Sequence, residues 1–371
     1  MILACRDEAR GSAAADSVNQ SVAAFIANRN GAAAAAAVTE EAAHPRDGET
    51  LATFMKLDLG SFDSIRAFAS SFLALPNTPL HILINNACGA SDAYQTTADG
   101  HELIYGVGQL GHFLLTSLLM DKLKASAPSR IVILTSTATT ISSSKGVVAM
   151  PVTDASKWSK MFVYAETKLA NALFAMELAR RSDATQAGVK ILAVHPGVIE
   201  TPLGHTLMPG FFFKLVALTK KTMEQGAATT CFAAAHPGVD NMRNGQYLAD
   251  CTPSKTSKLA YSEKLAKKVW DKCKAICGEA PFPDTEEEQE QQEHGEEEKK
   301  PVEEEKKKPV EEEKKKHVDK EKKHQQPGEE EEEEVKVTED GDAPLPSPKR
   351  KKKKKSRKEE SPVEDEMVTE D

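Results

Sequence analysis

The sequence lacks the features of metal-binding, secreted and membrane-spanning proteins. Its six cysteines are scattered through apolar segments, and Cys273 and Cys277 have three residues between them and no second pair, so a zinc site is not predicted. It has no run of eighteen or more apolar residues, and its start does not have the layout of a signal peptide. From the sequence we expect no metal, no transmembrane segment, and a cytoplasmic or other reducing intracellular location.

The first three quarters of the chain have almost no net charge, whereas the last quarter is highly charged. Of the 57 acidic and 48 basic residues, 32 and 21 lie between Thr285 and Asp371, which leaves 25 acidic and 27 basic residues before them. The mean hydropathy of -0.45 therefore reflects the tail. Blocks of Glu and Lys around repeated prolines offer little to bury, so we predict one globular domain over 1–280 and a disordered tail over 281–371.

Residues 1–280 alternate between short apolar segments and helical patterns. Strands are predicted at 1–4, 53–59, 80–85, 130–136, 189–194 and 245–248, and helices at about 5–28, 61–73, 99–123, 161–181, 223–235 and 257–276. Strands of continuous Ile, Leu and Val separated by helices are typical of a parallel sheet that is covered on both faces. The predicted fold class is therefore α/β, with a doubly wound, Rossmann-type parallel sheet.

The predicted helix over 161–181 carries a pair of residues suited to proton transfer. Tyr164 and Lys168 stand four residues apart, which places them one turn apart on the same helix face. A phenol has an ordinary pKa of about 10, and a neighbouring ammonium favours its ionised form. Such a pair can pass a proton to or from an alcohol or carbonyl oxygen, although Tyr and Lys are also ordinary helix residues.

Ligands of doubly wound sheets bind beyond the carboxyl ends of the strands, so the polar residues at these ends are the further candidates. They are Arg6, Asp58, the sequence Asn85-Asn86-Ala87, Ser136, and the sequence His195-Pro196-Gly197. Each of these is by itself a common turn residue. Their combination with the Tyr164 and Lys168 pair is what favours a binding site.

Together these motifs resemble the short-chain dehydrogenase/reductase family over about residues 1–278. The resemblance is closer to the branch of retinol dehydrogenases and WW-domain oxidoreductases. The segments that carry it are MILACRD at 1–7, GHFLLT at 111–116, KLAN at 168–171, HPGV at 195–198 and EQGA at 224–227.

The resemblance implies roles for the residues at the reacting end of the site. Tyr164 is expected to be the general acid or base. Lys168 is expected to lower the pKa of Tyr164 and to hold the nicotinamide ribose. Ser136 is expected to hydrogen-bond the reacting oxygen of the substrate.

The resemblance also implies the residues that hold the cofactor. Asp58 would lie by the adenine, and Asn85 and Ala87 beside the cofactor's ribose. Val198 and Thr201 would lie near the carboxamide. Arg6 suits a 2′-phosphate because a guanidinium pairs with phosphate in a bidentate manner, so the expected cofactor is NADP(H) rather than NAD(H).

The sequence departs from the family pattern in three places. The family's opening strand and glycine-rich turn would precede Met1, so we expect an N-terminally incomplete sheet and a truncated or fragmentary sequence. The G-x-G-x-x-G match at 106–111 is no substitute, because it follows no strand and lies in a helical run. Gly108 stands where the family has an asparagine that holds a relay water, and Cys88 replaces a glycine beside the cofactor.

The function expected from the resemblance is hydride transfer between NADP(H) and a carbonyl or alcohol of an apolar, retinoid-like or lipid-like substrate. One alternative is a non-catalytic binding or scaffold protein that has lost cofactor binding. Another depends on the basic run at 348–358, which would contact nucleic acid or direct the protein to the nucleus, or would only be a solvated polyelectrolyte.

Overall fold

The computed structural model of the 371-residue chain describes residues 1–33, 51–199 and 220–283. Thr201 and nearly all of the predicted tail lie outside these residues. The side chain of Phe282, two residues past the predicted boundary at residue 280, is buried in the main hydrophobic cluster.

The described residues alternate between strands and helices, as predicted. The strands are β1 (Ile2–Cys5), β2 (Thr53–Lys56), β3 (Ile82–Asn85), β4 (Ser129–Leu134), β5 (Val189–His195), β6 (Val198–Ile199), β7 (Lys220–Lys221), β8 (Gln246–Ala249) and β9 (Thr252–Pro253). The longer helices are α1 (Glu8–Ala33), α2 (Phe62–Leu73), α4 (Gly111–Ala125), α5 (Ser144–Ala149), α6 (Lys160–Ala184), α9 (Met223–Ala235) and α10 (Glu263–Cys277). Short helical pieces are α3 (Leu103–Tyr105), the π-helix η1 (Gly106–Leu110), and the 3-10 helices η2 (Thr137–Ile141), η3 (Ala155–Lys157), η5 (Pro237–Val239) and η6 (Lys258–Tyr261).

The sheet is parallel in its main part, which confirms the predicted α/β fold class. Five strands are hydrogen-bonded in the order β3-β4-β5-β8-β9, and of these only β9 runs antiparallel to its neighbour. The strands β1 and β2 form a separate parallel pair. No hydrogen-bonded ladder joins β1 to β3 among the described residues.

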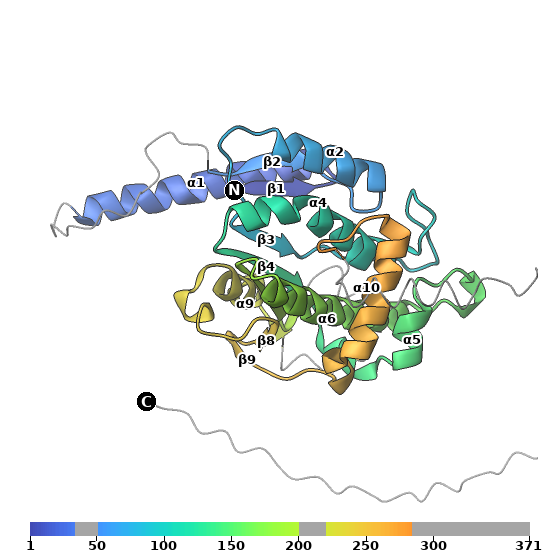
Figure 1. Cartoon of the computed structure of the whole chain (residues 1–371). Helices are drawn as coiled ribbons and strands as arrows, with labels where there is room; N and C mark the ends of the chain where they lie inside the picture. The colour runs from blue at the N-terminus through green and yellow to red at the C-terminus, as the bar shows by residue number, and fades with distance from the viewer. Residues whose placement is uncertain (34–50, 200–219, 284–371) are drawn as a thin grey trace, which may run out of the picture. The chain divides into compact units, whose positions relative to one another are not determined.

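Helices cover both faces of the sheet (Figure 1). On one face, α4 and α6 lie against β4 and β5, α2 packs on α4, and α10 packs on α6. On the other face, α9 covers β4 and β5, and α1 lies against β1 and β2. This arrangement leaves the carboxyl ends of the strands on one side of the domain, where the candidate residues follow them.

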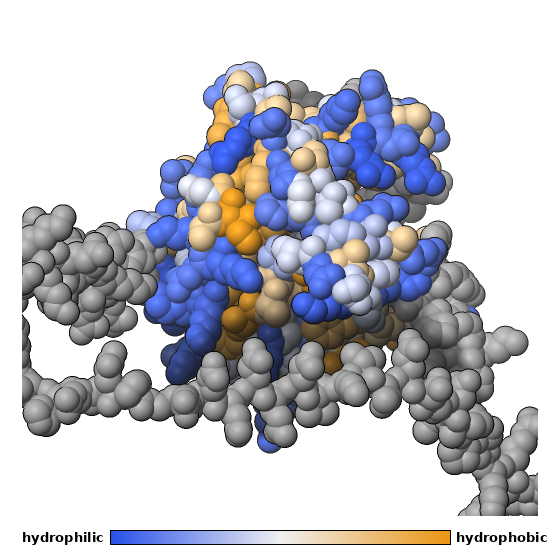
Figure 2. All heavy atoms as spheres, turned by 90° about the vertical axis from the view of Figure 1, so that its right-hand side faces the viewer, coloured by the Kyte–Doolittle hydropathy of each residue, from blue (hydrophilic) through white to orange (hydrophobic). Residues whose placement is uncertain are grey.

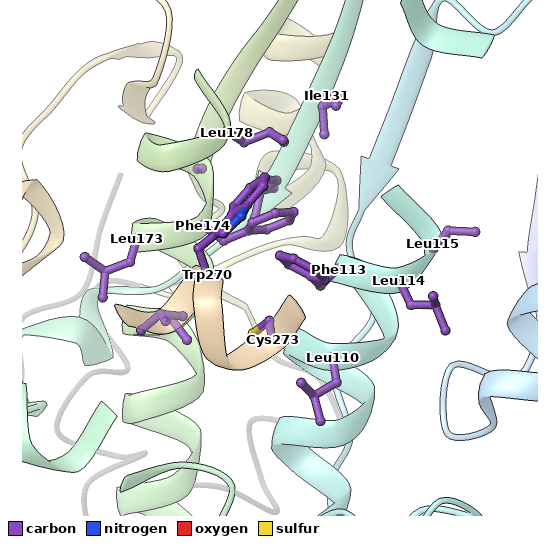
Figure 3. Packing of buried hydrophobic residues seen from close by; sticks show 14 of the residues in the cluster. Leu110, Phe113, Leu114, Leu115, Ile131, Leu173, Phe174, Leu178, Trp270 and Cys273 are labelled. Carbon is purple, nitrogen blue, oxygen red and sulfur yellow. The ribbon is translucent and has the colours of Figure 1, made fainter. Parts of the chain in front are cut away.

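The core between α4, α6 and α10 is built around an aromatic group (Figure 3). The ring of Trp270 lies with its centre 5.2 Å from that of Phe113 and 6.0 Å from that of Phe174, and all three side chains are buried. The guanidinium of Arg181 lies 4.4 Å from the Trp270 ring centre and donates to a carboxylate oxygen of Glu177 at 2.7 Å. The buried arginine is therefore both paired and stacked, which is what burial of a charge requires.

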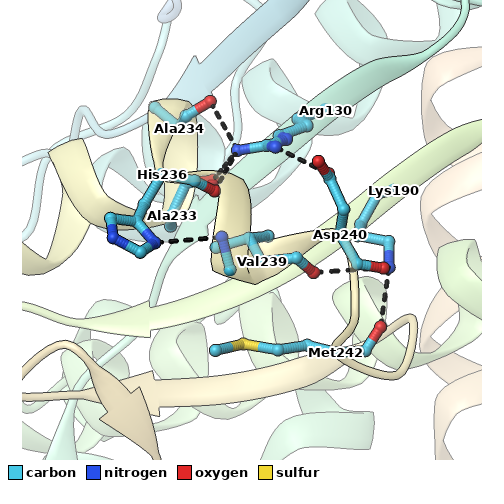
Figure 4. A network of polar contacts seen from close by, with 9 residues as sticks. Arg130, Lys190, Ala233, Ala234, His236, Val239, Asp240 and Met242 are labelled. Atoms are coloured by element: carbon cyan, nitrogen blue, oxygen red, sulfur yellow. Dashed lines mark hydrogen bonds and ion pairs between the residues drawn. The ribbon is translucent and has the colours of Figure 1, made fainter.

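On the opposite face, two basic side chains bind the chain that leaves α9 (Figure 4). The Arg130 side chain donates to the carbonyl oxygens of three residues at or after the end of α9, namely Ala233, Ala234 and His236, and pairs with Asp240 at 2.6 Å. The Lys190 amine donates to the carbonyl oxygens of Val239, Asp240 and Met242. Carbonyl groups that the helix leaves without partners are thus satisfied from β4 and β5.

Two helical predictions are wrong in detail. The predicted helix over 99–123 begins only at Leu103, and the π-helix η1 interrupts it before α4. The apolar residues over 161–181 recur at helical spacing and predict an amphipathic helix with one face against a core. The observed α6 helix is not amphipathic, because most of its side chains from Val163 to Ser182 are buried between the sheet, α5 and α10. Helices that are enclosed on every side bury polar residues as well, and here these form part of the site.

The run Leu103–Ala125 is long and apolar enough to cross a membrane by length and composition. In the structure, 78% of its apolar window is buried inside the protein. The core helix of a folded domain has the same properties, and this segment fills that position between β4 and α2.

Candidate active site

Three candidate side chains meet at the carboxyl end of β4. Ser136 follows β4 by two residues and caps η2, with its hydroxyl accepting from the backbone N–H of Ala138 at 3.2 Å. From α6, the partly buried Tyr164 is hydrogen-bonded to the Ser136 side chain. The Lys168 amine lies 5.8 Å from the Tyr164 ring centre and donates to the carbonyl oxygen of Leu134 at 3.0 Å. The sequence prediction thus identified three residues that the fold brings together.

The ionisation of Tyr164 differs from the prediction. Burial raises the pKa of its hydroxyl above the usual 10, the Cys88 thiol raises it further, and the hydrogen bond with Ser136 lowers it. Lys168 is not among the groups that shift the Tyr164 pKa, and its amine donates to the Leu134 carbonyl oxygen. Tyr164 is therefore a protonated phenol at neutral pH in this structure, ready to donate a proton.

The predicted residue Asn85, the last of β3, is buried beside this group. Its side-chain amide donates to the hydroxyl of Thr116 on α4 at 2.9 Å. Its side-chain oxygen is buried and has no partner in the structure. Buried polar atoms are nearly always hydrogen-bonded. We therefore expect this oxygen to accept a hydrogen bond from a bound ligand.

The π-helix η1 passes beside the catalytic helix and is held there by two side chains. Asn171 of α6 donates its amide to the Gly108 carbonyl oxygen at 2.7 Å and to the side-chain oxygen of Gln109 at 2.8 Å. The imidazole Nδ1 of His112 lies 3.0 Å from the same Gly108 oxygen. π-Helical turns are frequent at functional sites. Here the π-helix contacts α6 at Asn171, one turn of the helix from Lys168.

Two of the three departures from the family pattern, Gly108 and Cys88, lie next to each other. A side chain added at Gly108 would meet Thr167 Cγ2 at 3.0 Å and the Cys88 sulfur at 3.5 Å. Because Gly108 has no side chain, there is room beside it for Cys88, whose side chain is larger than that of the family's glycine. The neighbouring Gln109 directs its amide into the core, where it donates to the Cys273 sulfur at 3.5 Å.

The comparison with known protein families decides the identity of this arrangement. The family model described as short chain dehydrogenase matches residues 10–210. The chain belongs to the short-chain dehydrogenase family. This family consists of oxidoreductases that use a nicotinamide cofactor, and the site described above lies within the matched residues.

Curated relatives place this short-chain dehydrogenase in the retinol dehydrogenase-like branch. It is 35% identical to retinol dehydrogenase 14 of Mus musculus over 283 residues, which are 75% of this chain and 78% of that protein. It is 41% identical to retinol dehydrogenase 12 of Homo sapiens over 217 residues, with 58% and 66% covered. It is 39% identical to the chloroplastic short-chain dehydrogenase TIC 32 A of Brassica napus over 228 residues, with 58% and 69% covered.

A solved structure supports the fold. The crystal structure of an uncharacterised protein from Mycobacterium paratuberculosis aligns with a TM-score of 0.52 at 25% identity. The alignment covers 76% of this chain and 85% of the other.

The residues predicted to hold the cofactor of this short-chain dehydrogenase are placed at strand ends, and Thr201 lies outside the described residues. Arg6 and Ala87 are exposed directly after β1 and β3, and Val198 begins β6. Asp58 accepts a hydrogen bond from the Gly60 N–H at 2.9 Å and so shapes the turn after β2. Their positions agree with the predictions, and their roles remain predictions.

Sequence reasoning missed the residues that support the dehydrogenase site. His112 and Asn171 belong to the segments GHFLLT and KLAN, which carried the family resemblance without an assigned role. Both side chains are buried, and both reach the Gly108 carbonyl. The signal that could have identified these two residues is a polar side chain within an otherwise apolar helix. The groups that they contact are known only from the fold.

The side of the dehydrogenase to which the strand ends point has an apolar centre flanked by polar side chains (Figure 2). A cavity of about 530 Å³ lies between α5 and α10, and one of about 700 Å³ lies at the amino ends of β4 and β5. Neither is lined by Tyr164, Lys168 or Ser136. Among the described residues, no group of three or more His, Cys, Asp or Glu side chains is arranged to hold a metal ion.

The buried imidazole of His112 should make the stability of the dehydrogenase pH-dependent. Burial and the nearby Lys168 charge lower its pKa from 6.5 to about 3. The unfolded chain thus binds more protons between these pH values, so stability is complete above pH 6.5 and is lost as the pH falls below it. The loss from this group between pH 7 and 4.5 is expected to be about 2–3 kcal/mol.

Urea denaturation of the wild type and of His112→Gln at both pH values measures this contribution. The substituted protein should lose less stability on acidification, and His81→Gln, at an exposed position, should behave as the wild type. Equal acid sensitivity of the wild type and His112→Gln would contradict the assignment.

Proposed function

We propose that this short-chain dehydrogenase transfers hydride between NADP(H) and an apolar, retinoid-like or lipid-like substrate, and that it works as a carbonyl reductase. The observation that carries the proposal is the protonated Tyr164 hydroxyl, hydrogen-bonded to Ser136. An aldehyde or ketone oxygen that accepts hydrogen bonds from both hydroxyls would become more electrophilic at carbon. Tyr164 would then give its proton to that oxygen as the carbon is reduced.

The residues present fit the nicotinamide end of the cofactor and its adenosine end. The Lys168 ammonium has three donors, of which one is bonded to Leu134, and the oxygen of Asn85 lacks a partner. Arg6 presents an exposed guanidinium at the end of β1. When bound, the nicotinamide would supply the hydride. No glycine-rich turn for the diphosphate stands among the described residues, so Lys168, Asn85 and Arg6 are the groups assigned to cofactor binding.

The apolar substrate class is supported by the relatives and by the surface. Two of the relatives described above are named retinol dehydrogenases. The apolar centre of the strand-end face offers a surface on which a hydrocarbon chain loses contact with water.

Binding and turnover of the full chain test the proposal. Titration with NADPH should quench tryptophan fluorescence, and addition of retinaldehyde should then oxidise NADPH at a rate that depends on the aldehyde. Binding without oxidation by retinaldehyde or by straight-chain aldehydes would favour the alternative of a non-catalytic binding protein. Absence of NADPH binding would refute the proposed cofactor.

Arg6 is expected to determine the choice of cofactor. Arg6→Ala should raise the KM for NADPH by about tenfold or more, because a charge-assisted hydrogen bond contributes about 1.5–3 kcal/mol. The KM for NADH, which lacks the 2′-phosphate, should not change. Arg10→Ala is the control, since Arg10 is also exposed but lies one helical turn further along α1. An unchanged ratio of the two KM values in Arg6→Ala would contradict the role.

A further inference from the structure

One buried acidic side chain of the catalytic helix α6 takes no part in the site described above. Glu166 lies two residues after Tyr164 and two before Lys168, so its side chain leaves the helix about 200° away from theirs, on the other side. The side chain is 0% exposed, and no lysine or arginine among the described residues pairs with it. Acidic residues are almost never fully buried without a charged partner, so another contact holds Glu166 in place.

That contact is with Ser143, the residue that caps helix α5. The Glu166 Oε1 atom accepts from the backbone N–H of Ser143 at 2.9 Å and from its hydroxyl at 3.4 Å. The Ser143 hydroxyl in turn accepts from the N–H of Gly146 at 2.9 Å. The N–H and the hydroxyl of Ser143 thus both donate to the carboxylate, while the hydroxyl oxygen caps α5.

Glu166 replaces a side chain that α5 itself lacks. In a capping box, the third residue of a helix is Glu or Gln, and its side chain accepts from the backbone N–H of the N-cap residue. In α5 the third residue is Gly146, and a Cβ atom built there would overlap the Oε1 atom of Glu166. The carboxylate from α6 therefore occupies the place of the missing side chain and joins the two helices.

The contact closes a segment that starts in the active site. Ser136 and Ser143 are the N-cap residues of η2 and α5, which follow one another after β4. Ser136 is hydrogen-bonded to Tyr164 on one side of α6, and Ser143 is hydrogen-bonded to Glu166 on another. The segment 136–143 is therefore attached to the catalytic helix at both ends, within a single turn of that helix.

The second carboxylate oxygen indicates that fold stability does not account for this residue. Oε2 of Glu166 is buried and has no hydrogen-bond partner among the described residues, and burial raises the pKa of the carboxyl. Burial of an acidic group without a charged partner costs free energy that a leucine of similar size would not cost. What the carboxylate adds, and leucine would lack, is the contact with Ser143.

We propose that Glu166 is a positioning residue, which fixes the segment 136–143 on α6 through Ser143 and so holds the Ser136 hydroxyl in place beside Tyr164. This role rests on the proposed carbonyl reduction. A carbonyl oxygen that accepts from both hydroxyls needs both at hydrogen-bond distance, and hydrogen bonds weaken steeply when their geometry is disturbed. Movement of the segment would therefore weaken the contact of Ser136 with the substrate and leave the contacts of the cofactor unchanged.

Glu166→Leu removes the acceptor and keeps the volume of the side chain. The kcat/KM for retinaldehyde should fall by about tenfold or more, as expected for one weakened hydrogen bond to the substrate oxygen. The KM for NADPH should not change, because Lys168, Asn85 and Arg6 are not held by this contact. Glu166→Gln keeps an acceptor oxygen and should retain kcat/KM within about twofold. Gly146→Ala should behave as Glu166→Leu, because its Cβ displaces the carboxylate.

Ser182→Ala is the control for the loss of a buried hydrogen bond from the same helix. The Ser182 hydroxyl donates to the Val189 carbonyl oxygen at 2.7 Å, at the other end of α6. Its removal should lower stability and leave kcat/KM as in the wild type. If Ser182→Ala lost as much kcat/KM as Glu166→Leu, or if Glu166→Gln lost as much, Glu166 would not act by holding Ser143.

Fluorine NMR of the full chain labelled with fluorotyrosine tests the same contact without turnover. The signal of Tyr164 is identified by its absence in Tyr164→Phe. It should shift in Glu166→Leu and in Gly146→Ala, because the Ser136 hydroxyl moves, and keep its wild-type position in Glu166→Gln. A wild type that reduces no aldehyde would refute the proposed function, and the NMR signals would still report the positioning. An unchanged Tyr164 signal in Glu166→Leu would overturn the role of Glu166.

Discussion

Replacement of Tyr164 by phenylalanine is expected to lower kcat/KM for carbonyl reduction by about 10²–10⁴-fold, the usual contribution of a positioned general acid. The phenol of Tyr164 interacts with the Ser136 side chain, and phenylalanine keeps the ring while removing the hydroxyl proton. The fold should be retained, because the substitution loses one hydrogen bond, worth about 1 kcal/mol. Initial rates of NADPH oxidation and a urea denaturation curve measure the two effects separately.

Tyr105→Phe is the matched control for this substitution. Tyr105 is also buried, but its hydroxyl lies in the core, 3.8 Å from the Cys273 sulfur. Its removal should change stability slightly and leave kcat/KM near the wild-type value. If Tyr164→Phe kept the wild-type rate, or if both variants lost activity equally, Tyr164 would not be the acid.

The pH profile gives an independent sign of the same chemistry. The raised pKa of Tyr164 keeps the phenol protonated well above neutral pH. The rate of reduction should therefore show no decline from Tyr164 ionisation between pH 7 and about 9, two pH units above neutral. A decline in this range that Ser136→Ala shifts would indicate a lowered Tyr164 pKa, as first predicted from the pairing with Lys168.

The sequence allowed the strand ends and the catalytic helix to be predicted because these depend on local patterns. Continuous apolar runs ended where the strands end, within a few residues, and α9 was predicted with the bounds that the structure has. Ser136 was predicted to lie in the same site as Tyr164 because ligands of doubly wound sheets bind at the carboxyl ends of parallel strands. That rule concerns topology, which short apolar strands separated by helices largely determine.

The parts that could not be predicted depend on contacts between distant segments. The π-helix η1 is fixed by Asn171, which lies more than sixty residues away in the chain. The orientation of the Lys168 amine depends on the Leu134 carbonyl at the end of another strand. Neither contact has a signature in local spacing, and both bear directly on the pKa and shape of the site.

Trp270→Ala is expected to reduce the free energy of unfolding by about 3–5 kcal/mol, as large aromatic truncations in cores do. Trp270 is 1% exposed and packs between Phe113 and Phe174, which join α10 to α4 and α6. Its indole N–H has no partner in the structure, so the loss is one of packing and of the stacked Arg181 guanidinium rather than of a hydrogen bond.

Because α6 carries Tyr164 and Lys168, the loosened contact with α10 should also reduce activity at temperatures where the wild type is stable. Urea denaturation followed by circular dichroism measures the free energy of unfolding. Trp270→Phe should lose less than half of the stability that Trp270→Ala loses, because phenylalanine keeps part of the ring contacts. Met223→Ala, at a position 65% exposed, is the control and should change stability by no more than about 0.5 kcal/mol. A loss of under about 1 kcal/mol in Trp270→Ala would mean that α10 is not an integral part of the core, and that the aromatic group does not fix the position of the catalytic helix.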